Sequence, residues 1–134
     1  MSDSPRDHVA QFYSEVINGQ QLDALDRLVA EDFVDHGTPP TTGRDGFRGF
    51  LSGRVEGLPN VELHVDDWIV EGDRVVARCR VSGTHRGEFL GYAPTGRRVE
   101  WTAIHIWRVS EGRLAERWSQ ADMLRIVEQL KGKA

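Results

Sequence analysis

The residue best suited to chemistry is a histidine inside an otherwise apolar strand pattern. Alternation between Arg97 and Val109 predicts a strand on which His105 shares one face with apolar side chains only. Those side chains are Val99, Trp101, Ala103, Trp107 and Val109. A histidine in this position is either satisfied within the core or presented to a pocket, where an imidazole can donate to a developing oxyanion. The pattern leaves both interpretations open.

Asp122 is the second candidate, where the last predicted strand gives way to the last predicted helix. Aspartate is favoured as a helix N-cap. Alternatively, its carboxylate lies at the inner end of an aromatic pocket, where desolvation suits a carboxyl group to general acid/base work. The two roles are compatible. Strand parity places Trp118 and Gln120 on the face of Asp122, and with them Glu116, which fits an apolar interior only if the strand is bulged or its end exposed.

Four further polar residues have weaker claims. His36 and His85 lie at predicted strand or loop edges, where histidines are usually solvated. Asp66 and Asp67 lie within a predicted strand, so a regular strand turns one of them inward. A buried carboxylate without a partner is costly, so the inward residue either marks a site or is avoided by a bulge that turns both outward.

Composition excludes several classes of protein. The 21 acidic and 17 basic residues give a formal charge of −4, which argues against a nucleic-acid partner. The single cysteine, Cys79, excludes an internal disulfide. No phosphate-binding loop, zinc-protease, nucleophile-elbow or dinucleotide motif occurs, and no histidine spacing fits a metal site. Short apolar runs and an N-terminus without a signal-peptide core lead us to expect a cytoplasmic protein without a membrane partner.

The elements that must position these residues divide into a helical first half and a strand-rich second half. Apolar periodicity predicts helices around 9–17, 22–29, 47–55 and 124–130, and strands at 61–71, 74–88, 97–109 and 113–121. We therefore expect one α+β domain over residues 1–134, with a four-stranded antiparallel meander covered on one face by helices. A strongly curved sheet around a helix pair makes a cone with an open mouth.

Four segments together resemble the SnoaL-like polyketide cyclases. The stretch from Gly83 to Arg97 (GTHRGEFLGYAPTGR) is similar to that family's GxHxGxxxGxxPTGR segment, and His105 resembles its strand histidine. Residues 116–130 resemble its closing segment, an aromatic, an aspartate and then Gln-Leu, and residues 33–36 resemble its first short strand.

The resemblance implies an α+β cone of the NTF2/ketosteroid-isomerase type that needs no cofactor. The family's reaction is an intramolecular aldol condensation that closes the last ring of a polyketide ester. By position, Asp122 is the expected general acid/base and His105 its partner at the substrate carbonyl. The expected substrate is small, hydrophobic or polycyclic, and its candidate contacts are Tyr13, His36, His85, Trp101 and Trp118.

Two alternatives stay open beside the cyclase. The same cone hosts hydroxylation, isomerisation or epoxide opening, for which Asp66 or Asp67 would serve as a second acid. It also serves as a non-catalytic module that binds small molecules, because fold does not fix function. In either case we expect a homodimer or higher homo-oligomer through the sheet, since the outward parity of the third predicted strand carries Thr102, Ile104 and Ile106.

Overall fold

The first helix forms where the apolar spacing predicts it. In the computed structural model, which describes residues 4–132, Ser4 caps α1 (Pro5–Phe12) by accepting a hydrogen bond from the backbone N–H of Asp7 at 3.2 Å. The helix continues as a π-helical segment, η1 (Tyr13–Asn18). Its buried stripe faces the interior and carries Tyr13 into the core.

The second predicted helix, over 22–29, is confirmed except at its last residue, which is extended. A 3-10 turn, η2 (Leu22–Ala24), leads into the short α2 (Leu25–Leu28), and Val29 already begins strand β1 (Val29–His36). The cause is tertiary, because β1 pairs in parallel with a strand some eighty residues further along the chain. A short hairpin strand, β2 (Thr41–Thr42), and helix α3 (Arg44–Gly57) follow.

The predicted meander is present within a larger sheet. Its strands are β3 (Glu62–Glu71), β4 (Arg74–Thr84), β5 (Arg98–Ser110) and β6 (Arg113–Ala121). The sheet order is β2-β1-β6-β5-β4-β3, with β1 parallel to β6 and the other pairs antiparallel. The six strands are therefore the four of the predicted meander, β1, whose residues 33–36 the family resemblance indicated, and β2, which was not predicted. Strand β4 ends at Thr84 rather than near Glu88.

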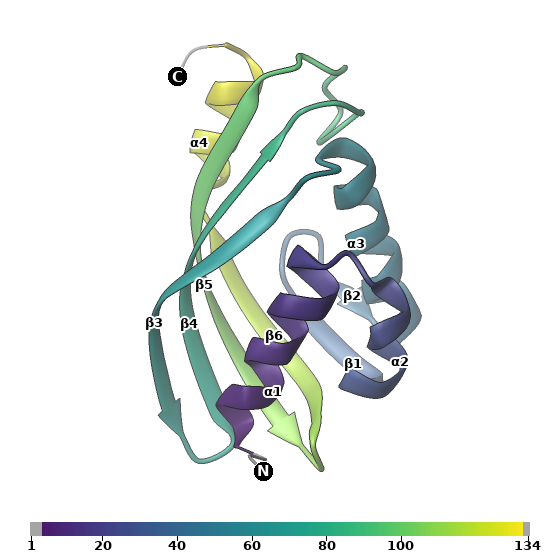
Figure 1. The fold of residues 1–134 in the computed structure, drawn as a ribbon, viewed down its shortest axis with the longest axis vertical. Coiled ribbons are helices and arrows are strands. Elements are labelled where there is room, and N and C mark those ends of the chain that lie inside the picture. The colour runs from purple at the N-terminus through teal and green to yellow at the C-terminus, as the bar shows by residue number, and fades with distance from the viewer. Residues whose placement is uncertain (1–3, 133–134) are drawn as a thin grey trace.

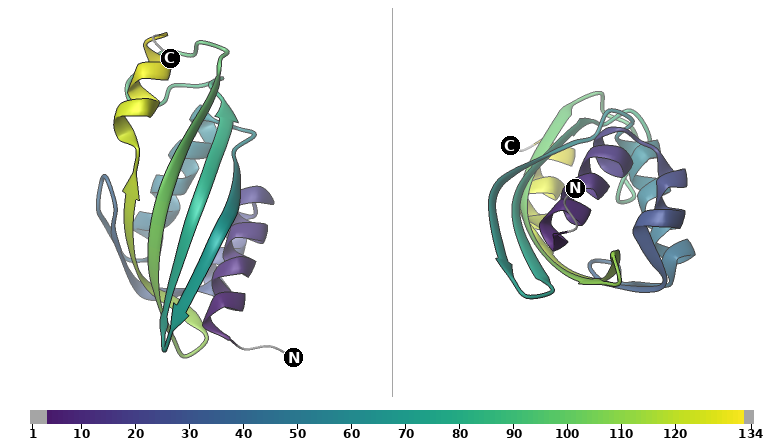
Figure 2. Two further views of the ribbon diagram at one scale, coloured as in Figure 1. Left: turned by 90° about the vertical axis from the view of Figure 1, so that its left-hand side faces the viewer. Right: turned by 60° about the horizontal axis from the view of Figure 1, so that its bottom comes forward.

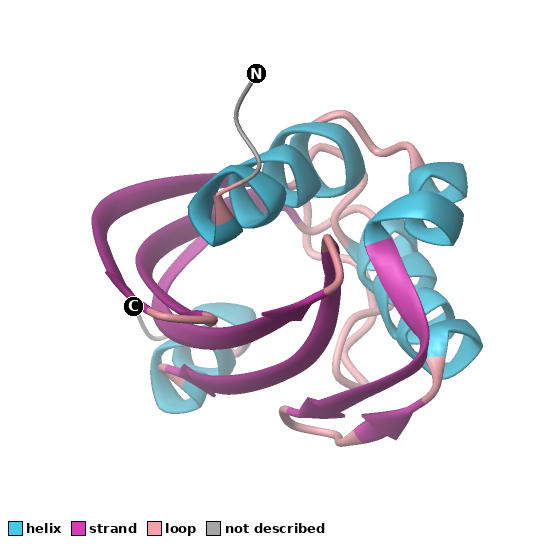
Figure 3. Ribbon diagram, turned by 90° about the horizontal axis from the view of Figure 1, so that it is seen from below, coloured by secondary structure: helices cyan, strands magenta, loops and turns pink. Residues whose placement is uncertain are grey.

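The sheet curves into the open cone that element order led us to expect. Viewed from below, the strands wrap around the interior and α1 lies across it (Figure 3). Helices α1 and α3 lie on the concave side, and α4 (Met123–Leu130) lies at the end of the molecule near the C-terminus (Figure 1). The convex faces of β3 to β6 carry no helix among the described residues (Figure 2, left). None of the described helices is long and apolar enough to cross a membrane.

Aromatic side chains fill the concave side. Phe33 and Phe47 have ring centroids 4.7 Å apart, and Phe12 and Trp107 have centroids 5.0 Å apart. All four side chains are fully buried. They join α1, α3, β1 and β5 into one core, on which the strands that carry the candidate residues are mounted.

Two β-bulges decide which side chains face this core. The register of β3 against β4 shifts between Val65 and Asp67, and that of β6 against β5 shifts between Leu114 and Glu116. A bulge inserts one residue and thereby exchanges the two faces of the strand beyond it. After the bulge in β6 the odd-numbered residues face inward, so the inward position predicted for Trp118 is wrong. The bulge itself is one of the two ways in which the sequence allowed Glu116 to avoid the interior.

Candidate functional site

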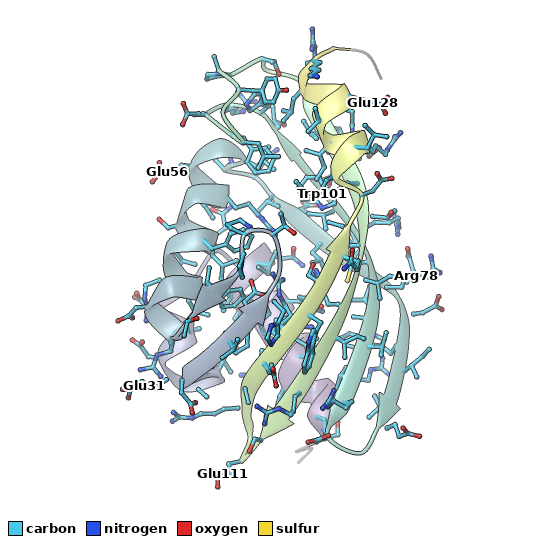
Figure 4. All side chains as sticks on the ribbon, turned by 180° about the vertical axis from the view of Figure 1, so that it is seen from behind. Glu31, Glu56, Arg78, Trp101, Glu111 and Glu128 are labelled. Atoms are coloured by element: carbon cyan, nitrogen blue, oxygen red, sulfur yellow. The ribbon has the colours of Figure 1, made fainter. Side chains whose placement is uncertain are left out.

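A cavity of about 310 Å³ opens between α3, the β5–β6 part of the sheet, the start of α4 and two loops. Its size is at the lower end of the range typical of small-molecule sites. Trp101 on β5 contributes to its wall, and Figure 4 shows this residue between α3 and α4. The lining is largely apolar and comprises Thr38, Pro39, Phe50, Gly53, Arg54, Glu88, Phe89, Leu90, Trp101, Arg117, Ser119, Gln120, Ala121, Met123 and Ile126.

The loop after β4 supplies one wall of the cavity because two glycines let it dock on α3. The carbonyl of Gly57, the last residue of α3, accepts hydrogen bonds from the N–H groups of Arg86 and Gly87 at 3.0 and 3.2 Å. A side chain at Gly87 would collide with the helix backbone, and one at Gly57 would collide with Phe89. This close approach brings the Phe89 ring to 6.3 Å from that of Trp101, roughly parallel to it.

His85 organises this loop from within. Its Nε2 donates to the carbonyl of Tyr92 at 3.2 Å, and its Nδ1 therefore accepts from the Thr95 hydroxyl at 3.0 Å and the Thr95 N–H at 3.3 Å. The side chain is fully buried, so the prediction of a solvated loop histidine is wrong. His85 is not among the residues that line the cavity. It holds the loop that carries Phe89.

His105 has a different set of partners. The indole N–H of Trp107 donates to the Tyr13 hydroxyl at 2.9 Å, and that hydroxyl lies 2.7 Å from Nδ1 of His105. The indole takes one lone pair of the Tyr13 oxygen, and when the hydroxyl proton points at Nδ1 the proton of the neutral ring is on Nε2. No hydrogen bond from residues 4–132 engages Nε2. With the proton on Nε2, the ring has one N–H donor without a protein partner.

Burial and charge keep this imidazole neutral. Desolvation lowers the pKa of His105 well below its usual value, and the positive charges of Arg117 and Arg54 lower it further. The same burial raises the pKa of the Tyr13 hydroxyl well above 10 and that of the Cys79 thiol to about 11. The His105 ring is therefore neutral near pH 7.

His105 is close to the cavity without being part of its lining. Its direct neighbour across β5 and β6 is Ser119, which lines the cavity, and the neighbour of Trp107 is Arg117, which also lines it. The prediction that His105 shares an apolar inward face is confirmed, because its side chain is only 4% exposed and its odd-numbered neighbours are buried.

A buried ion pair that sequence reasoning did not identify borders the site. Asp35 of β1 accepts two hydrogen bonds from the guanidinium of Arg117, at 2.8 and 3.0 Å, and both side chains are buried. The signal was available in β1, since Asp35 shares strand parity with the buried Phe33. The pair joins β1 to β6 and leaves neither charge uncompensated.

Arg54 is the second cationic group of the cavity and was also not identified from the sequence. It lies in the last turn of α3, with its guanidinium 5.0 Å from the centre of the Phe50 ring and 5.9 Å from that of Trp101. Desolvation, together with the charge of Arg117, lowers the pKa of Arg54 to about 10. None of the ion pairs formed by the described side chains includes it.

Asp122 is the N-cap of α4, as one of its two predicted roles requires. Its Oδ1 accepts from the N–H of Arg125 at 3.1 Å, and its own N–H donates to the carbonyl of Thr102 on β5 at 3.0 Å. The residue is exposed and is not among the cavity-lining residues, so its predicted burial at the inner end of the pocket is wrong. Its neighbours in the chain, Ala121 and Met123, do line the cavity. No hydrogen bond in the described chain joins Asp122 to His105.

The far end of α4 is tied to the same strand. The side-chain amide of Gln129 accepts from the N–H of Glu100 at 2.9 Å and donates to the carbonyl of Glu100 at 2.6 Å, as a neighbouring strand would. The family-like closing segment thus contains two docking residues, Asp122 and Gln129, one at each end of the helix.

The other residues predicted to contact the substrate lie in three places: the core, the cavity and the outer face of the sheet. Tyr13 lies in the core beside His105, and Trp101 lines the cavity. Trp118 stacks on His36 with ring centroids 5.1 Å apart, and these two residues lie outside the cavity lining. The structure therefore brings Trp101 to the cavity but does not bring His36, His85 or Trp118 there.

The acidic pair of β3 lies on the surface, because the bulge turns both carboxylates outward. Asp66 is bound by Arg80 and Asp67 by Arg78. Neither lines the cavity, so the arrangement of a second acid beside Asp122 is absent from the described residues. Nor do three or more His, Cys, Asp or Glu side chains gather anywhere in residues 4–132 in a way that would hold a metal ion.

Comparison with known proteins agrees with this architecture. The sequence profile described as SnoaL-like polyketide cyclase matches residues 7–130. IdmH from Streptomyces antibioticus, described as a candidate polyketide cyclase, is 33% identical, with a TM-score of 0.84 over 96% of this chain and 99% of its own. AclR from Streptomyces galilaeus, described as a candidate hydroxylase, is 26% identical, with a TM-score of 0.85 over 96% of this chain and 81% of its own.

A third structure supports the fold alone. A candidate SnoaL-like polyketide cyclase from Jannaschia sp. CCS1 has a TM-score of 0.87 at 24% identity, over 94% of this chain and 90% of its own. None of the curated protein sequences compared with the chain matches it.

Proposed function

Because the chain belongs to the SnoaL-like polyketide cyclase family, we propose that it closes a ring in a polyketide-derived ester by intramolecular aldol condensation, without a cofactor. Asp122 is the general acid/base and His105 is the hydrogen-bond donor to the substrate carbonyl. The observation that carries the proposal is the contact of Nδ1 of the neutral His105 with the Tyr13 hydroxyl, which leaves Nε2 available to donate beside the cavity.

The proposed steps use one base and one donor. A carboxylate oxygen of Asp122 removes the proton α to the ester, and the Nε2–H of His105 donates to the oxygen on which the enolate charge develops. The enolate carbon then attacks the ketone or aldehyde carbonyl of the same molecule, so that a carbon–carbon bond forms and the carbonyl π bond breaks. The resulting alkoxide takes back a proton from Asp122. A donor preorganised in a site that excludes water stabilises such an oxyanion strongly.

The capping role of Asp122 is compatible with this chemistry. Only Oδ1 is engaged, by the N–H of Arg125, so Oδ2 has no hydrogen-bond partner among residues 4–132. The cap fixes the orientation of the carboxylate while one oxygen stays available for a proton. A single carboxylate suffices, because the acid that receives the α-proton also returns it to the alkoxide.

The test separates the cap from the base. Asn caps helices as well as Asp does, whereas Ala does not, so Asp122→Asn keeps the cap and removes the base. We expect kcat on a cyclisable polyketide methyl ester, followed by mass spectrometry of the ring-closed product, to fall at least about 10²-fold with an unchanged melting temperature. Asp122→Ala is the matched control, with the same loss of activity and a lower melting temperature. Undiminished turnover by Asp122→Asn rules out Asp122 as the base.

We also propose that two copies pair through the convex face of the sheet. Ile69, Val76, Ile106 and Trp118 follow one another across β3, β4, β5 and β6 in direct register. Ile69 is 64% and Ile106 is 36% exposed, and Ile104 beside this row is 47% exposed. An uncovered apolar row of this kind is typical of an interaction surface.

Light scattering after size-exclusion chromatography measures the association directly. Wild type is expected at twice the mass of the chain, and Ile106→Glu at the mass of one chain, with the far-ultraviolet spectrum unchanged. A wild-type monomer at micromolar concentration contradicts the pairing and leaves the assignment of the catalytic residues untouched.

A further inference from the structure

We propose that the ligand of the cavity carries a carboxylate and that Arg54 is the residue that binds it. The inference deepens the proposed function, on which it rests, because it names the chemical class of the substrate in the same cavity. It depends on the contrast between two arginines that line one cavity, only one of which is paired with an acid.

The pairing of Arg117 shows what a satisfied guanidinium is like at this depth. Two of its N–H groups bind the two oxygens of Asp35, at 2.8 and 3.0 Å, in the parallel arrangement that guanidinium and carboxylate favour. The charge of Arg117 is therefore balanced within the protein. Asp35 forms no hydrogen bond or ion pair with Arg54 and acts on it only through its charge.

Arg54 presents the same group without a partner. No hydrogen bond or ion pair within residues 4–132 engages its guanidinium, and its contacts are the rings of Phe50 and Trp101. Glu88 is the one carboxylate of the lining, and it is exposed and unpaired with Arg54. Arg54 is half-buried, and a partly desolvated cation without a paired acid is unfavourable, so an anionic ligand that binds it reduces that penalty.

The walls of the cavity limit what can bear the carboxylate. Phe89 and Trp101 lie roughly parallel at one side, and Phe50 extends the aromatic surface towards Arg54. Planar aromatic bodies bind such walls by stacking. An aromatic or polycyclic ester that also bears a free carboxylate therefore fits, with its rings against Trp101 and its carboxylate at Arg54.

The experiment compares two ligands that differ only in charge. Isothermal titration calorimetry is carried out with 2-naphthoate and with its uncharged amide, 2-naphthamide, on wild type, Arg54→Met and Arg54→Lys. The control is Arg80→Gln, which removes an exposed positive charge on β4 that pairs with Asp66 and does not line the cavity. Binding of 2-naphthamide to each variant verifies that the cavity is intact.

Wild type and Arg80→Gln are expected to bind 2-naphthoate at least about tenfold more tightly than 2-naphthamide, as a charge-assisted bidentate pair allows. Arg54→Met is expected to bind the two alike, and Arg54→Lys to retain only part of the ratio, because an ammonium lacks the planar fork. Equal affinities in wild type, or a full ratio retained by Arg54→Met or Arg54→Lys, overturn the proposal. An Arg54→Met variant that does not fold leaves the wild-type ratio and Arg54→Lys to decide.

The two proposals fail separately. A protein that prefers 2-naphthoate through Arg54 but closes no ring in any ester retains its carboxylate site and loses its proposed reaction. A protein that closes the ring of an uncharged ester and does not distinguish the two naphthalenes retains the reaction and loses the carboxylate site.

Discussion

The two buried histidines of this chain have nearly opposite tasks. In His85 both ring nitrogens bind the loop in which the residue lies, through Tyr92 and Thr95. In His105 only Nδ1 is bound, by Tyr13, and Nε2 has no partner among the described residues. Both rings are buried and each accepts a hydrogen bond at Nδ1. They differ at Nε2, which is bound to the loop in His85 and is available to a ligand in His105.

The comparison also separates what motif and strand each provide. The family-like segment around His85 is a loop scaffold: Gly96 has a φ of +75° and its N–H donates to the His85 carbonyl at 2.8 Å. Residues with a side chain rarely adopt this φ, which explains why residue 96 is glycine. The loop holds Phe89 against α3, whereas strand β5 positions the N–H donor of His105. The family-like segment from Gly83 to Arg97 therefore forms part of the cavity wall, and β5 carries the polar group.

The largest effect is expected from removing the free nitrogen of His105. His105→Asn keeps a polar group near the position of Nδ1, where Tyr13 binds, and removes Nε2 with its proton. Loss of one preorganised oxyanion donor lowers kcat about 10²- to 10³-fold. Steady-state turnover of a cyclisable ester measures this, and His85→Asn is the matched variant, expected to retain kcat to within about tenfold. Equal losses in the two variants would remove the functional distinction.

The second prediction concerns the structural role of His85. His85→Ala removes a buried ring and its bonds to Tyr92 and Thr95, which lowers the free energy of unfolding by about 2–3 kcal/mol. Urea denaturation followed by circular dichroism measures the change. The loosened loop is expected to raise KM more than it lowers kcat, because Phe89 is no longer held against Trp101. An unchanged stability contradicts the scaffold role.

The third prediction concerns acid. The pKa of His105 is lowered well below 6.5 in the folded protein because of burial and the charges of Arg117 and Arg54. The unfolded chain therefore binds a proton near pH 6.5 that the folded chain does not, so stability falls as the pH drops below that value. The slope from this group is about 1.4 kcal/mol per pH unit. Urea unfolding of wild type and His105→Asn between pH 7 and pH 5 checks it, and parallel curves contradict it.

The smallest expected effect is on stability, and it compares the unpaired Arg54 with the paired Arg117. Arg54→Met removes a desolvated charge and keeps most of the side-chain volume, so we expect the unliganded protein to be more stable by about 1 kcal/mol. That corresponds to about 3 °C in melting temperature. Differential scanning calorimetry measures the shift. Arg117→Met is the control and is expected to be destabilised, because it leaves Asp35 buried without its partner; a lower melting temperature for Arg54→Met assigns Arg54 a structural role instead.

Local pattern predicted much of this structure. Alternation correctly predicted the inward face of β5, including His105, and residue type predicted the cap at Asp122. The bulge at Asp66 was one of two stated possibilities, and the structure confirms it. These features depend on neighbours within a few residues, which is why one sequence contains enough information to predict them.

What failed depends on distant contacts. Val29 has an extended backbone because β1 pairs with β6, and the apolar spacing over 22–29 does not indicate that pairing. Only the family-like residues 33–36 indicated a strand nearby. The bulge in β6 reverses its faces, which moved Trp118 outward and Arg117 inward. Arg54 belongs to an ordinary amphipathic helix pattern, and its lack of a partner becomes visible only when α3 is placed against the sheet.

The attachment of α4 at both ends has a consequence for how a ligand reaches the cavity. Asp122 holds the first turn of the helix near Thr102, and Gln129 holds the last turn to Glu100, so both anchors lie on the same short stretch of β5. A helix fastened twice to one strand cannot swing about a hinge at either end. We therefore expect ligand entry and release to depend on the loops at 38–39 and 88–90, which line the cavity and carry none of the proposed catalytic residues.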